Sequence, residues 1–500
     1  MLSGVFLIIR SALSGVKMGI RSRLRRVFPP TNRFFESSIR SVRDDIASIR
    51  SDELRRIEEL RMESVEAMKE LTARLDESNA RLASLDQRLL RLEKKTASLS
   101  YANMEYALPV ADGALSGRVL LVGWYGADNC GDELMLRSIL KHFKGKNTRV
   151  TVLLWDYMHY DPSDLPEFVD TLHYPSNTWH LRQLVSSFDV LVWGGGAILD
   201  DLQYTDDPFN FNTGNLFIRL SSMMHDEGKS VYSLGLSSNA VFTSEGYINK
   251  LARIVSESEY FSLRDEHSFR TFQNAGIDMS KVHLCEDVVF GDPDIKSVVP
   301  VQNSGNGRLL VGVVLFCSEE HTEQNVCLLT ALADYACKRN IDLDVRLIPF
   351  FDCYGADRRY LEMISDRVDL PNRLSIGEYS SSLEDNEIFN CDAVICYRYH
   401  AALLAGAKGI RSLFVCNDSH PHYPNKIAHL AKLFDYEDNV VDESALNESN
   451  FELYFDRLFA PAPAPNVRAG LFEETCEWLE SVCSSIASSV KTSEKMISGS

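Results

Sequence analysis

The stretch that decides the fold is "RVLLVGWYGADNCGDELMLRSIL", residues 118–140. Its first five residues are mostly large and apolar, which predicts a short buried strand. Gly123 and Gly126 then allow a tight turn, and apolar residues recur at helical spacing. We expect this helix to start near Glu133, with Asp132 as its cap. A buried strand that turns directly into an amphipathic helix is typical of a parallel α/β sheet.

The same alternation continues along most of the chain and is broken by the polar segment 299–308. It predicts two Rossmann-like, doubly wound α/β domains, residues 117–298 and 307–458, which face each other across a cleft. After a proline-containing linker we expect a helix at 466–490 and a disordered tail at 491–500. Strands are expected at 118–122, 149–154, 190–193, 230–234 and 260–263, and then at 309–315, 342–348, 393–396 and 411–415.

The N-terminal region differs in charge from the rest. Residues 1–100 contain 20 basic and 14 acidic residues, whereas the whole chain carries a net charge of −19. Residues 1–35 contain seven basic residues and no acidic one, interleaved with apolar residues. Such a segment suits the surface of an anionic membrane, although a disordered basic tail explains it equally well. Nucleic acid would attract the same charges, but we expect no nucleic-acid partner.

Residues 36–100 carry a second regularity, which predicts a helical coiled coil. Leucines fall on alternating steps of four and three with charged residues between them, and apolar residues upstream continue the stripe with a slip near Leu54. A stripe of this length needs a partner, so we expect a homo-oligomer held by residues 42–99. The leucines are Leu71, Leu75, Leu82, Leu85, Leu89, Leu92 and Leu99.

Composition excludes several classes of protein. No run approaches the eighteen or more apolar residues of a membrane-spanning helix, and we find no export signal. The 11 cysteines are scattered without close CxxC spacing, which is typical of reduced cytosolic thiols, so we predict no metal site. We therefore expect a cytoplasmic protein, with the basic segment able to hold it at the inner face of a membrane.

Ligands of doubly wound sheets bind beyond the carboxyl ends of the strands, so the loops there are the candidate site. In the first loop, Asn129 or Asp132 could bind a hydroxyl group, and plain helix capping is an equally good interpretation. The second loop, "VWGGGAILDD" (192–201), contains Gly194, Gly195 and Gly196 directly after a strand and ends in Asp201. Three successive glycines favour close approach of a ligand.

Basic residues dominate the later loops. In "CDAVICYRYHAALLAGAKG" (391–409), Arg398 offers a planar fork for a carboxylate or phosphate, and His400 can exchange protons near neutral pH. We expect both to face the cleft as a pair. Arg264 follows an earlier strand, and a solvated pair with Asp265 is its alternative explanation. Downstream, Tyr423 and Lys426 extend the cationic, hydrogen-bonding wall.

These motifs, in this order, resemble the polysaccharide pyruvyl transferase family over roughly residues 118–435. They are GxYGxxNxGDE, GGGxxxxD, SxRDxxS, RxHxxxxA and YxxK, and no single one is decisive. The resemblance implies a GT-B-like fold of two Rossmann-like domains, and a donor, phosphoenolpyruvate, that is served by Arg264, Arg398 and His400. The segments "YSLGLSSN" (232–239) and "CEDVVF" (285–290) depart from the family pattern, although the second keeps Asp287.

The function expected from the resemblance is transfer of a pyruvyl group from phosphoenolpyruvate to a pair of sugar hydroxyls. The product would be a ketal on a cell-surface or exported polysaccharide or its lipid-linked precursor. Arg398 and Arg264 would clamp the donor, with Lys426 and Tyr423 beside them, and His400 would be the general acid. No cofactor or metal is expected. Two alternatives stay open: a glycosyltransferase of the same architecture that uses a nucleotide sugar, and a non-catalytic coiled-coil scaffold.

Overall fold

The computed structural model describes residues 40–81 with gaps and residues 118–497 apart from several short segments. The chain divides into two compact units, residues 1–97 and 98–500, which are described separately. The residues left out are 1–39, 54, 57–58, 60, 63, 75–77, 79–80, 82–117, 156–159, 202–203, 206, 208–209, 239–240, 301–307, 371–372, 417–422, 447–449, 460–464 and 498–500.

The first sheet of the larger unit has seven parallel strands in the order β3-β2-β1-β4-β5-β6-β7. The chain starts in the middle at β1 and builds outward in both directions, so β1 and β4 are neighbours at the switch point of a doubly wound sheet. The strands are β1 (Arg118–Val122), β2 (Arg149–Leu154), β3 (Val169–His173), β4 (Val190–Leu199), β5 (Ser230–Ser238), β6 (Tyr260–Leu263) and β7 (Val282–Leu284). The helices are α3 (Cys130–Phe143), α4 (Thr178–Ser187), α5 (Thr213–Asp226), α6 (Glu245–Glu257) and α7 (Glu266–Asn274).

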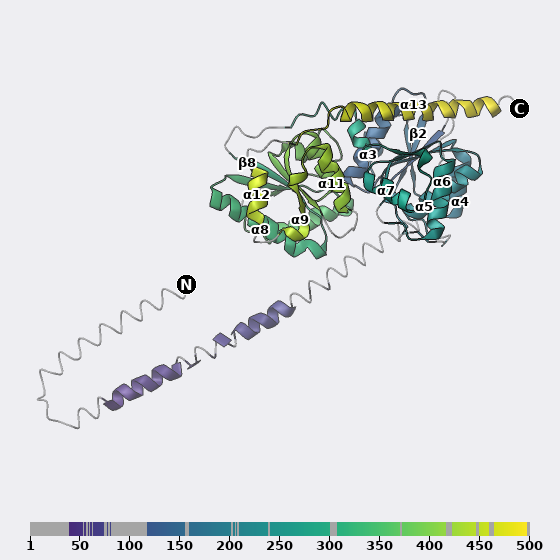
Figure 1. The fold of residues 1–500 in the computed structure, drawn as a ribbon. Helices are drawn as coiled ribbons and strands as arrows, with labels where there is room; N and C mark the ends of the chain where they lie inside the picture. The colour runs from purple at the N-terminus through teal and green to yellow at the C-terminus, as the bar shows by residue number, and fades with distance from the viewer. Residues whose placement is uncertain are drawn as a thin grey trace, which may run out of the picture. The chain divides into compact units, whose positions relative to one another are not determined.

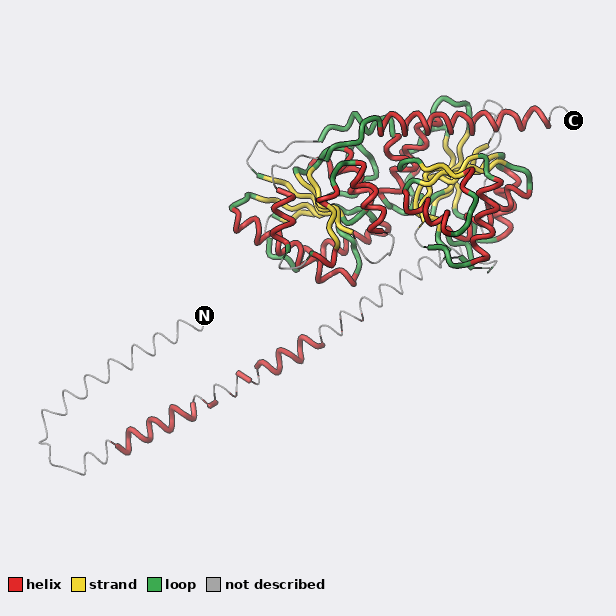
Figure 2. The backbone as a smooth tube through the Cα atoms, in the orientation of Figure 1, coloured by secondary structure: helices red, strands yellow, loops and turns green. Residues whose placement is uncertain are grey.

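The second sheet repeats this plan with six parallel strands in the order β10-β9-β8-β11-β12-β13. Its switch point lies between β8 and β11. Figure 2 shows helices flanking each of the two sheets. The strands are β8 (Leu309–Val314), β9 (Leu343–Leu347), β10 (Leu374–Ile376), β11 (Ala393–Cys396), β12 (Arg411–Cys416) and β13 (Val440–Asp442). The helices are α8 (Thr322–Arg339), α9 (Ala356–Ser365), α10 (Tyr399–Ala407), α11 (Tyr423–Leu433) and α12 (Phe451–Phe459).

The prediction of two doubly wound α/β domains is confirmed, and every predicted strand is present. Four short strands at or near the sheet edges, β3, β7, β10 and β13, were not predicted. Their burial is irregular, so their sequences lack the continuous apolar run of a central strand. The prediction also ended β4 too early: the strand runs on to Leu199 and includes all three of its glycines.

The final helix, α13 (Leu471–Ile497), returns from the second domain to pack on the first (Figure 1). Trp478 donates a 2.6 Å hydrogen bond to the hydroxyl of Tyr260, and Leu479 lies so close to Gly291 that a Cβ there would be only 2.5 Å away. One apolar cluster contains residues of α3, α10, α11 and α13, so the two domains share a core. The sequence predicted that this helix would end at residue 490, and it continues into the expected tail.

The N-terminal unit is helical at residues 40–53 and 64–74. Val42, Ile46, Val65, Met68 and Leu71 of the predicted stripe are 45–68% exposed in the single chain. Leu75, Leu82, Leu85, Leu89, Leu92 and Leu99 lie outside the described residues, as does the basic segment 1–35. Pairing of these helices with other copies therefore stays a prediction. None of the helices described is both long and apolar enough to span a membrane.

Candidate active site

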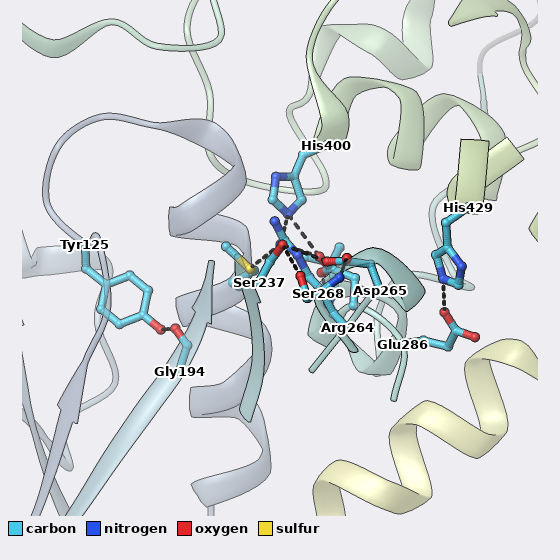
Figure 3. A network of polar contacts seen from close by, with 12 residues as sticks. Tyr125, Gly194, Ser237, Arg264, Asp265, Ser268, Glu286, His400 and His429 are labelled. Atoms are coloured by element: carbon cyan, nitrogen blue, oxygen red, sulfur yellow. Dashed lines mark hydrogen bonds and ion pairs between the residues drawn. The ribbon is translucent and has the colours of Figure 1, made fainter. Parts of the chain in front are cut away.

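The candidate site lies where the two α/β domains touch. His400, in the first turn of α10 directly after β11, reaches from the second domain to Arg264 of the first (Figure 3). It also approaches Asp287 of the first domain. Arg264 follows β6, and Asp287 follows β7, so both occupy the carboxyl edge of the first sheet. A second crossing joins His429 of α11 to Glu286 at 3.2 Å. The carboxyl edges of both sheets therefore contribute to one polar cluster.

Arg264, Asp287 and His400 form the centre of this cluster. The Arg264 Nη1 atom lies 2.6 Å from Asp287 Oδ2, and His400 Nε2 lies 3.4 Å from both of these atoms. The guanidinium also lies 4.7 Å from the centre of the Tyr399 ring. Arg264 is 4% exposed, and its buried Nε atom has no partner among the described residues. A buried donor without a partner at this point is suited to an anionic ligand or a water molecule.

The charges in the cluster are strongly coupled. Burial alone would raise the pKa of the Asp287 carboxyl, but Arg264 and His400 outweigh it and hold that pKa well below its usual range. Burial lowers the pKa of His400, and the Arg264 charge adds to this effect although Asp287 opposes it. In the ligand-free protein His400 is therefore mainly neutral at pH 7, with an Arg264–Asp287 ion pair beside it.

Gly131 explains how His400 can come so close to the first domain. It lies in the first turn of α3, and a Cβ atom added there would be 2.1 Å from His400 Nδ1. Any side chain at this position would displace the imidazole ring. Gly131, the third glycine of the GxYGxxNxGDE motif, is thus needed for contact between α3 and α10.

Arg398 makes different contacts from His400, so the expected pairing of these two side chains is not present. Arg398 Nη2 lies 3.1 Å and 3.4 Å from the two carboxylate oxygens of Asp357, and Nε donates to the carbonyl of Leu315 at 3.4 Å. Its guanidinium also lies near the rings of Phe316 and Phe351. The Nε and Nη2 atoms of the Arg398 guanidinium are therefore engaged within the second domain.

Asp357 connects Arg398 to the contact between the domains. It is 2% exposed and accepts hydrogen bonds from the backbone N–H groups of Phe350 at 2.9 Å and Phe351 at 2.7 Å. Phe350 in turn accepts a 2.9 Å backbone bond from Cys130, and Phe351 forms an antiparallel bridge with Asn129. Arg398, through Asp357, thus supports the segment that pairs with the start of α3.

Lys426 lies on α11 and is 5% exposed. Burial, reinforced by the Arg264 charge, lowers the pKa of Lys426 to about 8, although Asp265 opposes this shift. Asp265 caps α7 by accepting from the Ser268 backbone at 2.7 Å and also accepts from the Ser237 hydroxyl at 2.7 Å (Figure 3). Arg264 therefore pairs with Asp287 rather than with Asp265. The side chain of Tyr423 lies outside the described residues.

The acidic residues of the first loop are buried at the start of α3. The helix begins at Cys130 with Asn129 at the cap position, so the prediction that Asp132 is the cap was wrong. Burial, opposed by the Arg264 charge but reinforced by Glu133, raises the pKa of the Asp132 carboxyl to about 8. Burial also raises the pKa of Glu133 to about 7, although its Oε1 atom accepts a 2.6 Å bond from the Gly126 N–H. Asp132 is therefore largely protonated at neutral pH.

The three glycines of β4 pack against their own domain. A Cβ on Gly194 would lie 2.6 Å from the Tyr125 hydroxyl, one on Gly195 would lie 2.6 Å from Met135 Sδ, and one on Gly196 would lie 3.2 Å from Asp132 Oδ1. Packing thus already requires small residues here, and contact with a ligand stays a prediction.

Asp201 holds the chain segment that leads into α6. Its Oδ2 atom accepts from the Thr243 hydroxyl at 3.1 Å and from the Ser244 N–H at 2.9 Å. This role explains the aspartate of the GGGxxxxD motif without any ligand.

Two important residues were missed by the sequence analysis as site residues. Asp287 was noted only as a retained position in a divergent motif, and Asp357 was not singled out at all. Asp287 follows the short strand β7, which has no clear apolar pattern. Asp357 lies in the first turn of α9, where an acidic residue is unremarkable. The position of Asp287 directly after a strand was the one feature of the sequence that could have identified it as a site residue.

The solved structures that are similar to this chain include UDP-GlcNAc 2-epimerases and MurG. UDP-GlcNAc 2-epimerase from Methanocaldococcus jannaschii is 12% identical, with 72% of this chain and 98% of that chain covered and a TM-score of 0.46. MurG from Acinetobacter baumannii is 11% identical, with 75% and 99% covered and a TM-score of 0.41. These similarities concern the fold alone. No curated protein matches the chain.

A family model described as polysaccharide pyruvyl transferase matches residues 129–419. The matched region includes Asn129, Arg264, Asp287, Arg398 and His400, whereas Lys426 lies just beyond it. It covers more than half of the sequence and includes strands of both sheets, and it contains the GGGxxxxD, SxRDxxS and RxHxxxxA motifs of the resemblance. This chain therefore belongs to the polysaccharide pyruvyl transferase family.

Proposed function

We propose that the chain transfers the pyruvyl group of phosphoenolpyruvate to two hydroxyls of one sugar, forming a cyclic ketal on a polysaccharide or its lipid-linked precursor. The observation that supports this most is the polar cluster at the domain contact, where Arg264, although paired with Asp287, keeps a buried, unpartnered donor beside His400. A donor that carries a carboxylate and a phosphate needs such counter-charges, and Lys426 and Arg398 supply two more.

The proposed reaction is an addition to an enol ether. A proton is added to the methylene carbon of phosphoenolpyruvate, which makes C2 electron-poor, and one sugar hydroxyl attacks C2. Phosphate leaves with its C–O bonding electrons, and the second hydroxyl closes the ketal. Two hydroxyl protons are lost: one balances the new methyl group and the other leaves with the phosphate. We propose that no resident cofactor or metal takes part.

His400 and Asp132 are two groups near Arg264 that can supply the proton. His400 is mainly neutral in the free protein because its pKa is lowered, and the negative charge of a bound donor would raise that pKa and favour the imidazolium form. Asp132 already carries a proton at neutral pH, since its pKa is raised to about 8. We assign the proton donor to His400, and Asp132 is the group that would replace it.

A thermal-shift comparison tests the donor. Phosphoenolpyruvate at 100 times its dissociation constant should stabilise the protein by about 2.7 kcal/mol, whereas UDP- and GDP-sugars should not. Phosphate release that depends on an added sugar, in buffer with EDTA, would support the transfer reaction without a divalent metal. Stabilisation by a nucleotide sugar alone would instead indicate a glycosyltransferase, and stabilisation by none of the ligands would indicate a scaffold.

We also propose that residues 42–99 join several copies of the chain and that the basic segment 1–35 holds the assembly against the inner face of an anionic membrane. The exposed apolar side chains at residues 42–71 support the first part. The seven basic residues among the first 35 support the second.

A further inference from the structure

Aromatic side chains gather where the first three strands of the first sheet end. Trp124 follows β1, Trp155 follows β2 and Tyr174 follows β3. The Trp124 and Trp155 rings lie 4.5 Å apart between centroids with a tilt of 31°, and Trp155 meets Tyr174 edge-on at 5.8 Å. Trp179, in the first turn of α4, is 50% exposed. Three of the chain's five tryptophans are therefore found at this edge of the sheet.

Trp124 and Trp155 differ from the tryptophans that serve the core. Trp193 donates its indole N–H to Ser221 at 2.9 Å, and Trp478 donates its N–H to Tyr260 at 2.6 Å. Trp124 and Trp155 are partly buried, as Trp478 is, but neither of their indole N–H groups has a partner among the described residues. Each thus presents an apolar ring together with a polar donor, the combination that suits an interface with a ligand.

The loops that carry these rings are tied to one another. The backbone N–H of Trp155 donates to the Tyr125 carbonyl at 2.7 Å, and the backbone N–H of Tyr174 donates to the Leu154 carbonyl at 3.2 Å. The Tyr174 hydroxyl donates to the Gly123 carbonyl. Backbone and side-chain bonds therefore fix the position of the aromatic group before any ligand arrives, which limits the entropy lost on binding.

The aromatic group is also close to the candidate active site. The β1 strand lies next to β4, the strand that carries Gly196, and Gly196 approaches the carboxylate of Asp132. A Cβ on Gly123 would lie 2.8 Å from the carbonyl oxygen of Gly194 in β4, and this same Gly123 accepts from the Tyr174 hydroxyl. Strand β4 thus packs against the loop that carries Trp124 through Gly194, and against Asp132 through Gly196. The Asp132 carboxyl is in turn near enough to Arg264 for that charge to oppose the rise in its pKa.

We infer that Trp124 and Trp155 form a binding platform for the pyranose ring of the acceptor sugar. The C–H groups on one face of a pyranose are apolar and stack on aromatic rings, while its hydroxyls can accept from the indole N–H groups. This inference rests on the proposed function, because it gives the acceptor a place beside the donor cluster. A nucleotide base is the competing occupant, since bases also stack on aromatic rings.

The test uses the full chain and methyl pyranosides of glucose, galactose, mannose and N-acetylglucosamine as probes, followed by saturation-transfer NMR. Wild-type protein should bind at least one probe through its ring C–H protons. Trp124→Leu and Trp155→Leu should each weaken that binding about tenfold, equivalent to about 1.4 kcal/mol. Trp124→Phe should retain most of the affinity. Trp478→Leu, which removes a partly buried tryptophan elsewhere, should leave sugar binding unchanged.

Two further measurements separate the possible failures. Oxidative footprinting of wild-type protein needs no variant, and the bound sugar should protect Trp124 and Trp155 but not Trp478. The thermal shift with phosphoenolpyruvate should persist in both leucine variants. If wild-type protein shows no shift with phosphoenolpyruvate, the proposed function fails. If that shift is present but the leucine variants bind the sugar as wild type does, the inference of a sugar-binding platform is wrong. It is also wrong if uridine protects the two rings from oxidation and the sugars do not.

Discussion

At the scale of single residues, the main difference from the sequence-based expectation concerns Arg398. The RxH motif suggested that Arg398 and His400 act as one unit because they are two residues apart. In the structure their side chains have different partners. Arg398 is bound by Asp357 of its own, second domain, whereas His400 contacts Arg264 of the first domain. The sequence shows which residue types follow β11, but side-chain direction depends on partners that are distant in sequence, such as Asp287 and Asp357.

We predict that Asp357 positions Arg398 for the donor. Asp357→Asn keeps an oxygen that can accept from the Phe350 and Phe351 N–H groups but loses the charge that holds Arg398. It should raise the KM for phosphoenolpyruvate about tenfold with a smaller change in kcat. Asp357→Ala also leaves two buried N–H groups without an acceptor, so it should lower the melting temperature as well.

Steady-state kinetics and melting curves of the two variants check this prediction. Arg358→Lys is the matched control, because Arg358 lies on the same helix and pairs with the exposed Glu378 at 2.7 Å. Equal behaviour of the Asn and Ala variants in both measurements would contradict the assigned role.

A second prediction concerns Asp132 and pH. The folded state keeps this carboxyl protonated up to about pH 8, because its pKa is raised to about 8, whereas an unfolded chain releases the proton near pH 4. Stability should therefore fall as pH rises between these values, by at most about 1.4 kcal/mol per pH unit from this group. Urea denaturation at several pH values should show a shallower decline in Asp132→Asn. An unchanged slope would mean that Asp132 ionises normally.

At the scale of elements, the central strands were predictable because each is a continuous apolar run. The course of β4 was not, because glycines usually indicate a turn. Here Gly194 and Gly195 stay inside the strand, where side chains of the first loop and of α3 fill the space above them. Only the packed structure distinguishes a glycine that admits a ligand from one that admits Tyr125 or Met135.

The contact between α3 and α10 gives a prediction at this scale. Gly131→Ala should push the His400 ring out of place, because the new Cβ would be 2.1 Å from Nδ1. We expect kcat/KM to fall at least tenfold, about 1.4 kcal/mol in activation free energy, and to approach that of His400→Ala. The pH dependence of kcat should change in the same direction in both variants.

Gly246→Ala is the control for this substitution. Gly246 lies in the first turn of α6, and a Cβ there meets only the Ser244 hydroxyl at 3.9 Å. It should keep full activity and melt at the same or a slightly higher temperature, since alanine favours a helix by up to about 1 kcal/mol over glycine. Full activity in Gly131→Ala would show that His400 does not need its present position.

At the scale of the whole molecule, the shared core and α13 join the two α/β domains more extensively than a simple linker would. The apolar cluster contains residues of α3, α10 and α11, and α13 covers the first domain after leaving the second. This arrangement could not be predicted from the sequence, which shows that α13 is amphipathic but not which domain it covers. His400 and Arg264 are buried where the two domains meet, so the shifts in their pKa values also depend on the contact between the domains.

The last prediction is that the N-terminal helix assembles several copies. Val65, Met68 and Leu71 are 45–68% exposed in the single chain, and burying such side chains contributes roughly 25 cal/mol per Å² of apolar surface. Leu71→Glu together with Leu82→Glu in the full chain should convert the assembly to monomers in light scattering, because charges at core positions of a coiled coil are strongly unfavourable. Activity on soluble sugars should persist, since the candidate site lies within one copy.

Flotation with anionic liposomes should weaken in the same variant, because several basic segments bind together more tightly than one. A wild-type chain that is already monomeric would remove the basis for both effects.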